Sequence, residues 1–269
     1  MPDFSRVLIT GGDGRIASEI DFGIKLGHEK IDITDINSIR KALEEYSPSA
    51  VLNLASLDLK ASQNNPFLAN KINALGVYNL ALETKRINIP LIIISSGAVF
   101  NGKAEDNFNE DSIPNPSNIY GQTKYQSEIN ALVNPKSYII RTGWLFGFIK
   151  NGNFFNKMLD SAKLGNKVMA TYDQFGSFTY IRDFVNELKN VISNNEPGIY
   201  HIANSGRANA EEFAKEMISQ LRSVSKIDRI SISESEKEGI LRSRSEVLIS
   251  KKVKMRNWQE ALREKLNGS

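Results

Sequence analysis

The amino-acid sequence predicts an α/β fold in which helices cover both faces of a doubly wound parallel sheet. Apolar runs of strand length alternate along the chain with longer segments of helical period, which is the pattern of such a sheet. The first run, residues 6–10, leads directly into a glycine-rich turn, and the run at residues 91–95 ends in serines. In a doubly wound sheet both features fall at the carboxyl edge of the strands, where ligands bind.

The predicted elements follow one another in a regular order. Strands are expected at residues 6–10, 50–54, 91–95, 138–141, 168–170, 199–202 and 229–232. Helices are expected at residues 66–86, 121–133, 153–164, 181–193, 210–222 and 258–266. Too few residues separate the glycine turn from Asp32 for a full helix and a full strand. We therefore expect one or two helical turns at residues 16–20 and a short strand at 22–26, so that the second unit is shortened.

Composition excludes several classes of protein. The 269 residues are 41% hydrophobic and 24% charged, which is ordinary for a globular protein. The net charge of +3 comes from 34 basic and 31 acidic residues that are mixed along the chain, so we expect no nucleic-acid partner. Apolar runs such as residues 90–94 are far shorter than the roughly 20 residues of a membrane span. The absence of cysteine and of a signal-peptide pattern predicts a cytoplasmic protein without disulfides.

The glycine-rich turn at residues 10–17 (Thr-Gly-Gly-Asp-Gly-Arg-Ile-Ala) predicts a dinucleotide-binding Rossmann sheet. One glycine lets the backbone reverse sharply, and a second lets it approach a pyrophosphate group that is met by amides at a helix N-terminus. The choice between NAD(H) and NADP(H) stays open. Asp32 could bind the ribose of NAD, although the segment 32–35 could equally cap a helix. Lys25 and His28 could meet the extra phosphate of NADP or lie in solvent.

A serine, a tyrosine and a lysine form the candidate catalytic group. Tyr120 and Lys124 are one helical turn apart and project from the same face. A phenol has a pKa near 10, and a nearby ammonium group with the positive nicotinamide ring would stabilise the phenolate and lower that pKa. The hydroxyl group of Ser96, or of Ser95, ends a strand and could hydrogen-bond a substrate oxygen. Together these residues indicate general acid-base chemistry on a carbonyl or alcohol.

Over nearly its whole length the chain resembles dTDP-4-dehydrorhamnose reductases, a branch of the extended short-chain dehydrogenase/reductases. The Arg-Thr-x-Trp motif at residues 141–144 and the Asp-Gln-x-Gly motif at 173–176 are more specific than the glycine turn. Further matching segments are residues 10–17, 51–55, 95–102, 120–124 with Glu128, 152–154 and 198–201.

The resemblance implies an NAD(P)H-dependent reduction of the carbon-4 ketone of a dTDP-6-deoxyhexulose to dTDP-L-rhamnose. In that reaction Ser96 would polarise the ketone, Tyr120 would donate the proton, and Lys124 would hold the nicotinamide ribose. The implied cofactor-binding residues are Gly11, Asp13, Gly14, Arg15, Ile16, Asp32, Ile33, Asn53, Ala55, Ser56, Tyr120 and Lys124. The implied residues near the nucleotide-sugar are Ser96, Gly97, Trp144, Asn153, Gln174 and Arg242.

The sequence departs from the family mainly on the sugar side. Residues 97–98 are Gly-Ala where many members carry Asp-Tyr, so two substrate-facing side chains are missing. Residues 59–62 replace an expected Val-Asp-x-x-Glu stretch, Phe178 replaces a proline, and Arg242 is followed by serine rather than proline. These departures therefore concern the identity of the sugar and leave the catalytic residues unchanged.

The order of the predicted elements also indicates two parts with different functions. Residues 1–145 would form the cofactor-binding Rossmann domain, which residues 166–200 would complete. Residues 146–165 and 201–269 would form a small C-terminal α/β lobe that binds the substrate. The segment from Trp144 to Asn153 and Arg242 fall outside the regular strand-helix alternation, which is the reason for assigning them to this lobe.

Two alternative functions remain open. One is an epimerase or a reductase of another nucleotide-sugar. The other is a non-catalytic NADP-binding regulator, because the regulatory subunit of methionine adenosyltransferase resembles the same family. No metal site is expected, since His201 lies in an apolar strand and His28 in a loop. The sequence does not determine the oligomeric state, and a homodimer is one possible state.

Overall fold

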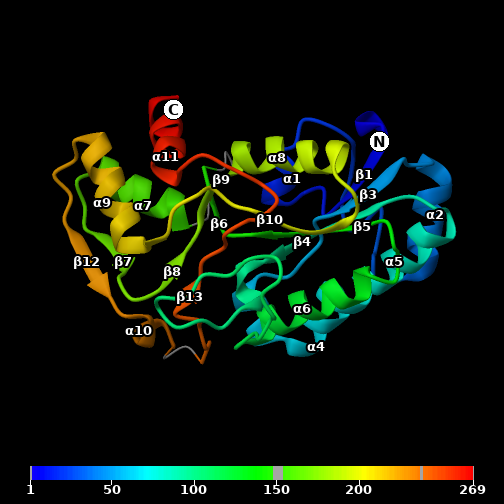
Figure 1. The fold of residues 1–269 in the computed structure, drawn as a ribbon, viewed down its shortest axis with the longest axis horizontal. Helices are drawn as coiled ribbons and strands as arrows, with labels where there is room; N and C mark the ends of the chain where they lie inside the picture. Colours follow the sequence, from blue (N-terminus) through cyan, green and yellow to red (C-terminus); the bar gives the residue numbers. More distant parts are fainter. Residues whose placement is uncertain (1, 148–153, 237–238, 269) are drawn as a thin grey trace.

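The computed structural model describes residues 2–147, 154–236 and 239–268 (Figure 1). Its centre is a six-stranded sheet in the order β10-β5-β4-β3-β1-β2. These strands are β1 (Val7–Thr10), β2 (Ile24–Leu26), β3 (Ala50–Asn53), β4 (Leu91–Ser96), β5 (Ser137–Thr142) and β10 (Gly198–Ile202). All neighbouring strands pair in parallel, and the order reverses between β1 and β3. The predicted doubly wound sheet is therefore confirmed.

Helices cover both faces of this sheet. Ile92 and Ile94 of β4 pack into a core with α8 (Ile181–Asn194), while α1 (Arg15–Glu19) contacts α8. Leu91 and Ile93 face the other way, into a second core with α2 (Ile36–Tyr46) and α5 (Gly76–Arg86), beside which α6 (Ile119–Ala131) packs. Because the central strands are buried on both faces, they read in the sequence as nearly continuous apolar runs.

The second unit is as short as predicted. Helix α1 has five residues and β2 has three. The Gly12 amide donates to the carbonyl of Leu26 at 2.9 Å, and a Cβ on Gly12 would lie 2.7 Å from the Leu26 nitrogen. Ile31 and Ile33 follow β2 and are buried in the core without forming a strand.

The helix expected at residues 66–86 consists of three segments in the structure. It begins as α4 (Pro66–Ala69), continues as the π-helix η2 (Asn70–Leu75) and ends as α5. An additional helix, α3 (Leu59–Asn64), precedes it, and Asp58 caps its first turn. Inserted π-turns of this kind often occur at functional sites.

The C-terminal part adds smaller elements beside the sheet. Its helices are α7 (Phe154–Lys163), α9 (Ala210–Leu221), α10 (Ile232–Glu236) and α11 (Trp258–Asn267). Two short 3-10 helices lie outside this part, η1 (Phe4–Arg6) before β1 and η3 (Gly97–Val99) after β4. Strand β6 (Trp144–Phe146) pairs with β9 (Phe178–Tyr180). A three-stranded sheet has the order β11 (Ala208–Asn209), β8 (Phe175–Gly176), β13 (Ser245–Glu246).

The stretch at residues 166–200, which was expected to complete the Rossmann domain, divides in two. Helix α8 and strand β10 belong to the main sheet, but β7 (Val168–Thr171) pairs in parallel with β12 (Ile227–Ile230) in a separate sheet. The pairing of β7 with β12 instead of with the main sheet follows from the packing of α9. Helix α9 packs on both β7 and β12, and these three elements lie together at one end of the molecule (Figure 1).

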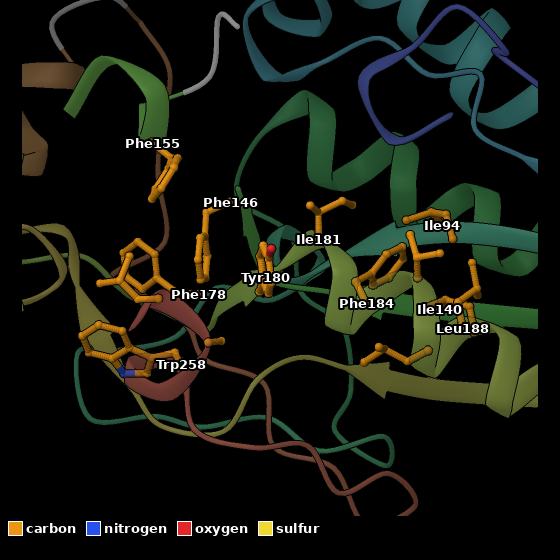
Figure 2. Packing of buried hydrophobic residues seen from close by; sticks show 14 of the residues in the cluster. Ile94, Ile140, Phe146, Phe155, Phe178, Tyr180, Ile181, Phe184, Leu188 and Trp258 are labelled. Atoms are coloured by element: carbon orange, nitrogen blue, oxygen red, sulfur yellow. The ribbon is translucent and has the colours of Figure 1, made fainter. Parts of the chain in front are cut away.

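The two parts share one hydrophobic core. Figure 2 shows Phe146, Phe155, Phe178, Tyr180 and Trp258 in a band that continues into the side chains between β4, β5 and α8. Such a shared core fixes the C-terminal elements relative to the sheet. No helix among the described residues is long and apolar enough to span a membrane.

Candidate active site

The glycine-rich turn lies at the switch point of the sheet, between the ends of β1 and β3. Gly11 has a φ of +64°, and a Cβ there would lie 2.7 Å from the Ala55 nitrogen, so only glycine fits this turn. Gly14 is the N-cap residue of α1, where no side chain caps the helix. A Cβ on Gly14 would meet only the Gly11 carbonyl oxygen within 4 Å, so its outer side is open to a ligand.

Three of the expected cofactor-binding residues, Asn53, Ala55 and Ser56, lie at the end of β3 or directly after it. Asn53 is buried and accepts a 2.5 Å hydrogen bond from the hydroxyl group of Thr10. Ala55 packs against Gly11, and the Ser56 hydroxyl group donates to the side-chain oxygen of Asn73 at 3.1 Å. The structure thus brings these three residues and the glycine turn to one edge of the sheet.

Two further expected cofactor-binding residues, Asp32 and Ile33, differ in their burial and in their contacts. Asp32 accepts hydrogen bonds from the amide and the hydroxyl group of Thr34, both at 2.8 Å. Burial alone would raise the pKa of Asp32, but these hydrogen bonds outweigh it and the pKa is lowered, so the carboxylate is charged. Asp35, not Asp32, caps α2. The Ile33 side chain is 3% exposed and packs against Gly76, which rules it out as an open contact surface.

The two serines at the end of β4 face opposite ways. The Ser95 hydroxyl group is buried and donates to Glu128 Oε1 at 2.5 Å. The Ser96 side chain caps the turn after β4 by accepting from the Ala98 amide at 3.1 Å, and it also hydrogen-bonds Tyr120. The sequence left a choice between these serines, and the structure places Ser96 beside the candidate proton donor.

Tyr120 lies in the first turn of α6, which Asn118 caps by accepting from the Gly121 amide at 2.9 Å. Burial raises the pKa of Tyr120 to about 12, against the opposite effect of the Ser96 hydrogen bond, and the charges of Glu246 and Asp58 add to the rise. In the protein without a cofactor, the expected lowering of the Tyr120 pKa by Lys124 does not occur. Desolvation and the two carboxylates dominate, so the phenol is protonated at neutral pH.

Lys124 is buried one turn further along α6. Burial lowers its pKa from 10.5 to about 8, and the negative charge of Glu128 opposes that shift. At neutral pH the ammonium group is therefore still charged, but it is held in an environment that disfavours its charge. A buried titratable group with a shifted pKa is typical of functional sites.

A buried ion pair lies beneath these residues. Arg141 of β5 donates from Nε and Nη2 to the two oxygens of Glu128 at 2.9 and 2.7 Å. Its Nη1 lies 3.4 Å from His201 Nε2, and the other ring nitrogen of His201 lies 2.9 Å from the Ile249 carbonyl oxygen. Burial lowers the pKa of His201 to about 4, so this histidine is neutral. His201 is thus a satisfied core residue, as predicted, and His28 is exposed.

The substrate side of the site is built around Glu246. Trp144 Nε1 donates to Glu246 Oε2 at 3.2 Å, and the Trp144 ring packs on Gly176. Gly97 is buried beneath the backbone of Glu246. Burial raises the pKa of Glu246, against the effects of the Trp144 hydrogen bond and the charge of Arg242. Trp144, Gly97 and Arg242 are therefore brought together as expected, around a carboxyl group that the sequence analysis missed.

The other expected substrate residues are placed less directly. Gln174 is buried at 5% exposure, next to Asp173. Asp173 itself accepts from Ser231, from the Ile232 amide and from Arg244, so this part of the Asp-Gln-x-Gly motif fastens α10 and β13. Asn153 lies outside the described residues.

Sequence reasoning missed a second residue, Asn73 of the π-helix. Its side-chain oxygen accepts from the Leu57 amide at 2.7 Å, and its amide donates to the Thr123 hydroxyl group at 3.1 Å. It therefore ties the loop after β3 to the helix that carries Tyr120. Its only signal in the sequence was an asparagine inside an apolar helical pattern. Among the described residues no cluster of three or more metal-ligating side chains occurs.

Comparisons with known proteins agree on one family. The model of the RmlD substrate binding domain matches residues 5–268. The spore coat polysaccharide biosynthesis protein SpsK of Bacillus subtilis is 32% identical over 278 residues, covering 97% of each chain. A dTDP-4-dehydrorhamnose reductase of Mycolicibacterium smegmatis is 31% identical over 222 residues, which cover 78% of this chain and 67% of the relative.

A solved structure extends this similarity to the fold. The dTDP-4-dehydrorhamnose reductase of Bacillus anthracis, in complex with NADP, superimposes with a TM-score of 0.90 at 26% identity. The match covers 99% of this chain and 100% of the solved chain.

The lowered pKa of Lys124 leads to a prediction about stability. A shift from 10.5 to about 8 means that folding disfavours the charged ammonium group. Replacing Lys124 with methionine should therefore stabilise the protein without cofactor at pH 7 by about 3 kcal/mol, while abolishing activity. Between pH 8 and 10.5 the unfolded chain holds a proton that the folded chain has released. The free energy of unfolding of the wild type therefore rises with pH in this range, and the stability difference between it and Lys124→Met should shrink.

Urea unfolding of both proteins at pH 7 and pH 10 measures this effect. Lys163→Met, at an exposed position in α7, serves as the matched control and should change little at either pH. A Lys124→Met protein that is no more stable than wild type at pH 7 would contradict the prediction. So would a stability difference that does not change with pH.

Proposed function

The chain belongs to the RmlD substrate binding domain family, and we propose that it is an NAD(P)H-dependent nucleotide-sugar reductase. Its proposed reaction reduces the carbon-4 ketone of a dTDP-6-deoxyhexulose to give dTDP-L-rhamnose. One observation carries the proposal. The protonated Tyr120 is hydrogen-bonded to Ser96 and lies one helical turn from the buried Lys124, at the carboxyl edge of the sheet beside the glycine turn.

The residues at the switch point fit a nicotinamide dinucleotide. The open outer side of Gly14 and the uncapped N-terminus of α1 suit a pyrophosphate group, which Arg15 and Asp13 would flank. Ile16 would line the turn, and Asp32 would lie toward the adenosine part. The charged Asp32 supports NAD(H), whereas the relative from Bacillus anthracis is in complex with NADP, so both cofactors remain within the proposal.

The chain's own residues supply the proton transfer. When bound, NAD(P)H supplies the hydride that adds to the ketone carbon. The hydroxyl groups of Ser96 and Tyr120 would both contact the ketone oxygen and stabilise its developing negative charge. The Tyr120 proton passes to that oxygen, because the phenol is the neutral acid at working pH. The ammonium group of Lys124 would stabilise the phenolate that remains and would hold the nicotinamide ribose of the bound cofactor.

The sugar-binding side would be formed by the C-terminal lobe. Trp144, Arg242 and Gln174 would border the sugar, and Trp144 is fixed by its hydrogen bond to Glu246. Asn153 belongs to the same proposal, although it lies outside the described residues. In this proposal the cofactor domain and the substrate lobe differ in function, while one hydrophobic core joins them.

The rival functions lack a comparable observation. A non-catalytic regulator would have no need to hold a protonated phenol and a buried ammonium group together, since Lys124 destabilises the fold. Another nucleotide-sugar reductase or an epimerase would use the same three residues. Another reductase would differ from the proposed reaction only in the sugar, whereas an epimerase would retain an oxidised cofactor and would consume no NAD(P)H.

A homodimer is also proposed. Phe67 and Leu75 on the helix from α4 to η2, Tyr78 on α5, and Leu132 just after α6 expose large apolar side chains. These helices are neighbours in the structure, and exposed apolar patches of this kind mark protein interfaces. We further propose that the enzyme acts in the cytoplasm, which its cysteine-free sequence supports.

Replacing Gly14 with valine tests the cofactor site. The branched side chain would fill the space that the pyrophosphate needs, so NAD(P)H binding should be lost while the fold remains. Thermal unfolding with and without NADPH or NADH measures this, because a bound cofactor stabilises by mass action. The control Gly268→Val, near the C-terminus, should keep the wild-type shift. Equal shifts in all three proteins would refute the assignment.

Replacing Tyr120 with phenylalanine tests the chemistry. The variant should still bind cofactor and nucleotide-sugar but reduce the ketone about 100-fold more slowly or worse, because general acid catalysis is lost. NADPH oxidation with the dTDP-hexulose measures the rate. The control Tyr125→Phe, one residue beyond Lys124 on the same helix, should stay active. Equal, background-level rates for wild type and Tyr120→Phe on every nucleotide-sugar ketone would favour the regulator instead.

Replacing Leu132 with glutamate tests the dimer. A buried charge at the proposed interface should convert the protein to a monomer, as measured by sedimentation equilibrium. The control Val224→Glu introduces the same charge at a residue that is 86% exposed in the C-terminal lobe. A monomeric wild type, or a Leu132→Glu protein that remains dimeric, would contradict this prediction.

A further inference from the structure

Glu246 places a carboxyl group in the proposed sugar pocket. It ends the short strand β13, which pairs with β8, and it is 8% exposed. Its Oε2 accepts from Trp144 Nε1 at 3.2 Å. A carboxyl group offers about four lone-pair sites, and this bond uses one of them. The indole therefore fixes the carboxyl group without exhausting its capacity to accept hydrogen bonds.

The space for Glu246 is created by Gly97. A Cβ at position 97 would lie 2.8 Å from the Glu246 carbonyl oxygen and 3.2 Å from its Cβ. Any larger residue at 97 would push β13 away from the end of β4. Gly97 directly follows Ser96, so Glu246 lies against the residue next to the one that hydrogen-bonds Tyr120.

Electrostatics place the same carboxyl group near the reacting atoms. The charge of Glu246 raises the pKa of Tyr120, and the charge of Arg242 acts on Glu246 in turn. The carboxyl group is thus close enough to Tyr120 and to Arg242 for their charges to interact. A buried acid that served the fold alone would be better replaced by a neutral side chain.

We propose that Glu246 determines substrate specificity by accepting a hydrogen bond from a hydroxyl group of the sugar ring beside the reacting ketone. The inference rests on the proposed function. Trp144 holds the carboxyl group of Glu246 in place. The absence of a side chain at Gly97 lets Glu246 lie close to the end of β4. Removing the partner hydroxyl group would leave a buried carboxyl group without its partner, which is how such sites reject an analogue.

The test compares ketone substrates that differ by one hydroxyl group. Steady-state kinetics are measured with the dTDP-hexulose and with analogues that lack the hydroxyl group at carbon 2 or at carbon 3. Wild type should lose about 10- to 100-fold in kcat/KM on one of these analogues. Glu246→Gln keeps an oxygen for Trp144 but turns an NH2 donor toward the sugar. This variant should have the same kcat/KM on the parent substrate and on that analogue. The change should come mainly from a raised KM for the parent substrate.

A matched variant separates specificity from folding. Glu211→Gln changes another carboxyl group of 8% exposure, which pairs with Arg229 in the lobe, and it should keep the wild-type discrimination. A Glu246→Gln enzyme that discriminates as wild type does, or a wild type indifferent to both hydroxyl groups, would overturn the inference alone. A wild type that reduces no dTDP-hexulose would remove the proposed function, and the inference with it.

Discussion

The geometry of the site depends on the buried pair between Glu128 and Arg141. Glu128 is four residues beyond Lys124 on α6, and it receives two hydrogen bonds from β5 and one from Ser95 of β4. The pair therefore fixes α6 to two strands of the sheet. A rotation of α6 about its axis would break the bidentate contact and leave a charge buried without a partner, which typically costs 3–5 kcal/mol. The position of Tyr120 opposite Ser96 is set by this constraint.

The same pair explains how a second cation can lie buried nearby. Glu128 carries one negative charge, and Arg141 already neutralises it, so little of that charge is left to stabilise Lys124. Burial consequently lowers the pKa of Lys124, although Glu128 is only one turn away. The buried ammonium group thus lowers the stability of the fold. The helix that carries it is held in place by the ion pair and by the Asn118 cap. Storing unfavourable energy in this way is common where a residue is kept for chemistry rather than for packing.

Much of this arrangement could be predicted from the sequence, because it follows from local patterns. Buried strands read as continuous apolar runs, the glycine turn identifies the switch point, and the spacing of Tyr120 and Lys124 fixes their common face. The shortened second unit followed from simple counting of residues. These features depend on neighbours in the chain, which a single sequence displays directly.

The features that could not be predicted depend on contacts between distant segments. Strand β7 has an ordinary strand pattern, but only the packing of α9 decides that it pairs with β12 rather than with the main sheet. Ile33 looks like a residue at the edge of a cofactor site, yet its side chain packs against Gly76. Asn73 and Glu246 act across 50 and 102 residues of sequence, on Thr123 and on Trp144 respectively, so no spacing rule could identify them.

The sugar side differs from the catalytic side in how it is held. Ser96, Tyr120 and Lys124 lie on long elements of the main core, whereas Glu246 is carried by a two-residue strand. That strand is fastened by the pairing of Ser245 with Gly102 and of Leu248 with Phe108. A backbone-fastened segment can exchange its side chains without disturbing the core, since its hydrogen bonds do not depend on residue type. The backbone and Cβ of Glu246 fill the space that Gly97 leaves at the end of β4. Under the proposed function, a different side chain at position 246 would therefore alter which sugar is recognised, while the residues proposed to transfer the proton would stay in place.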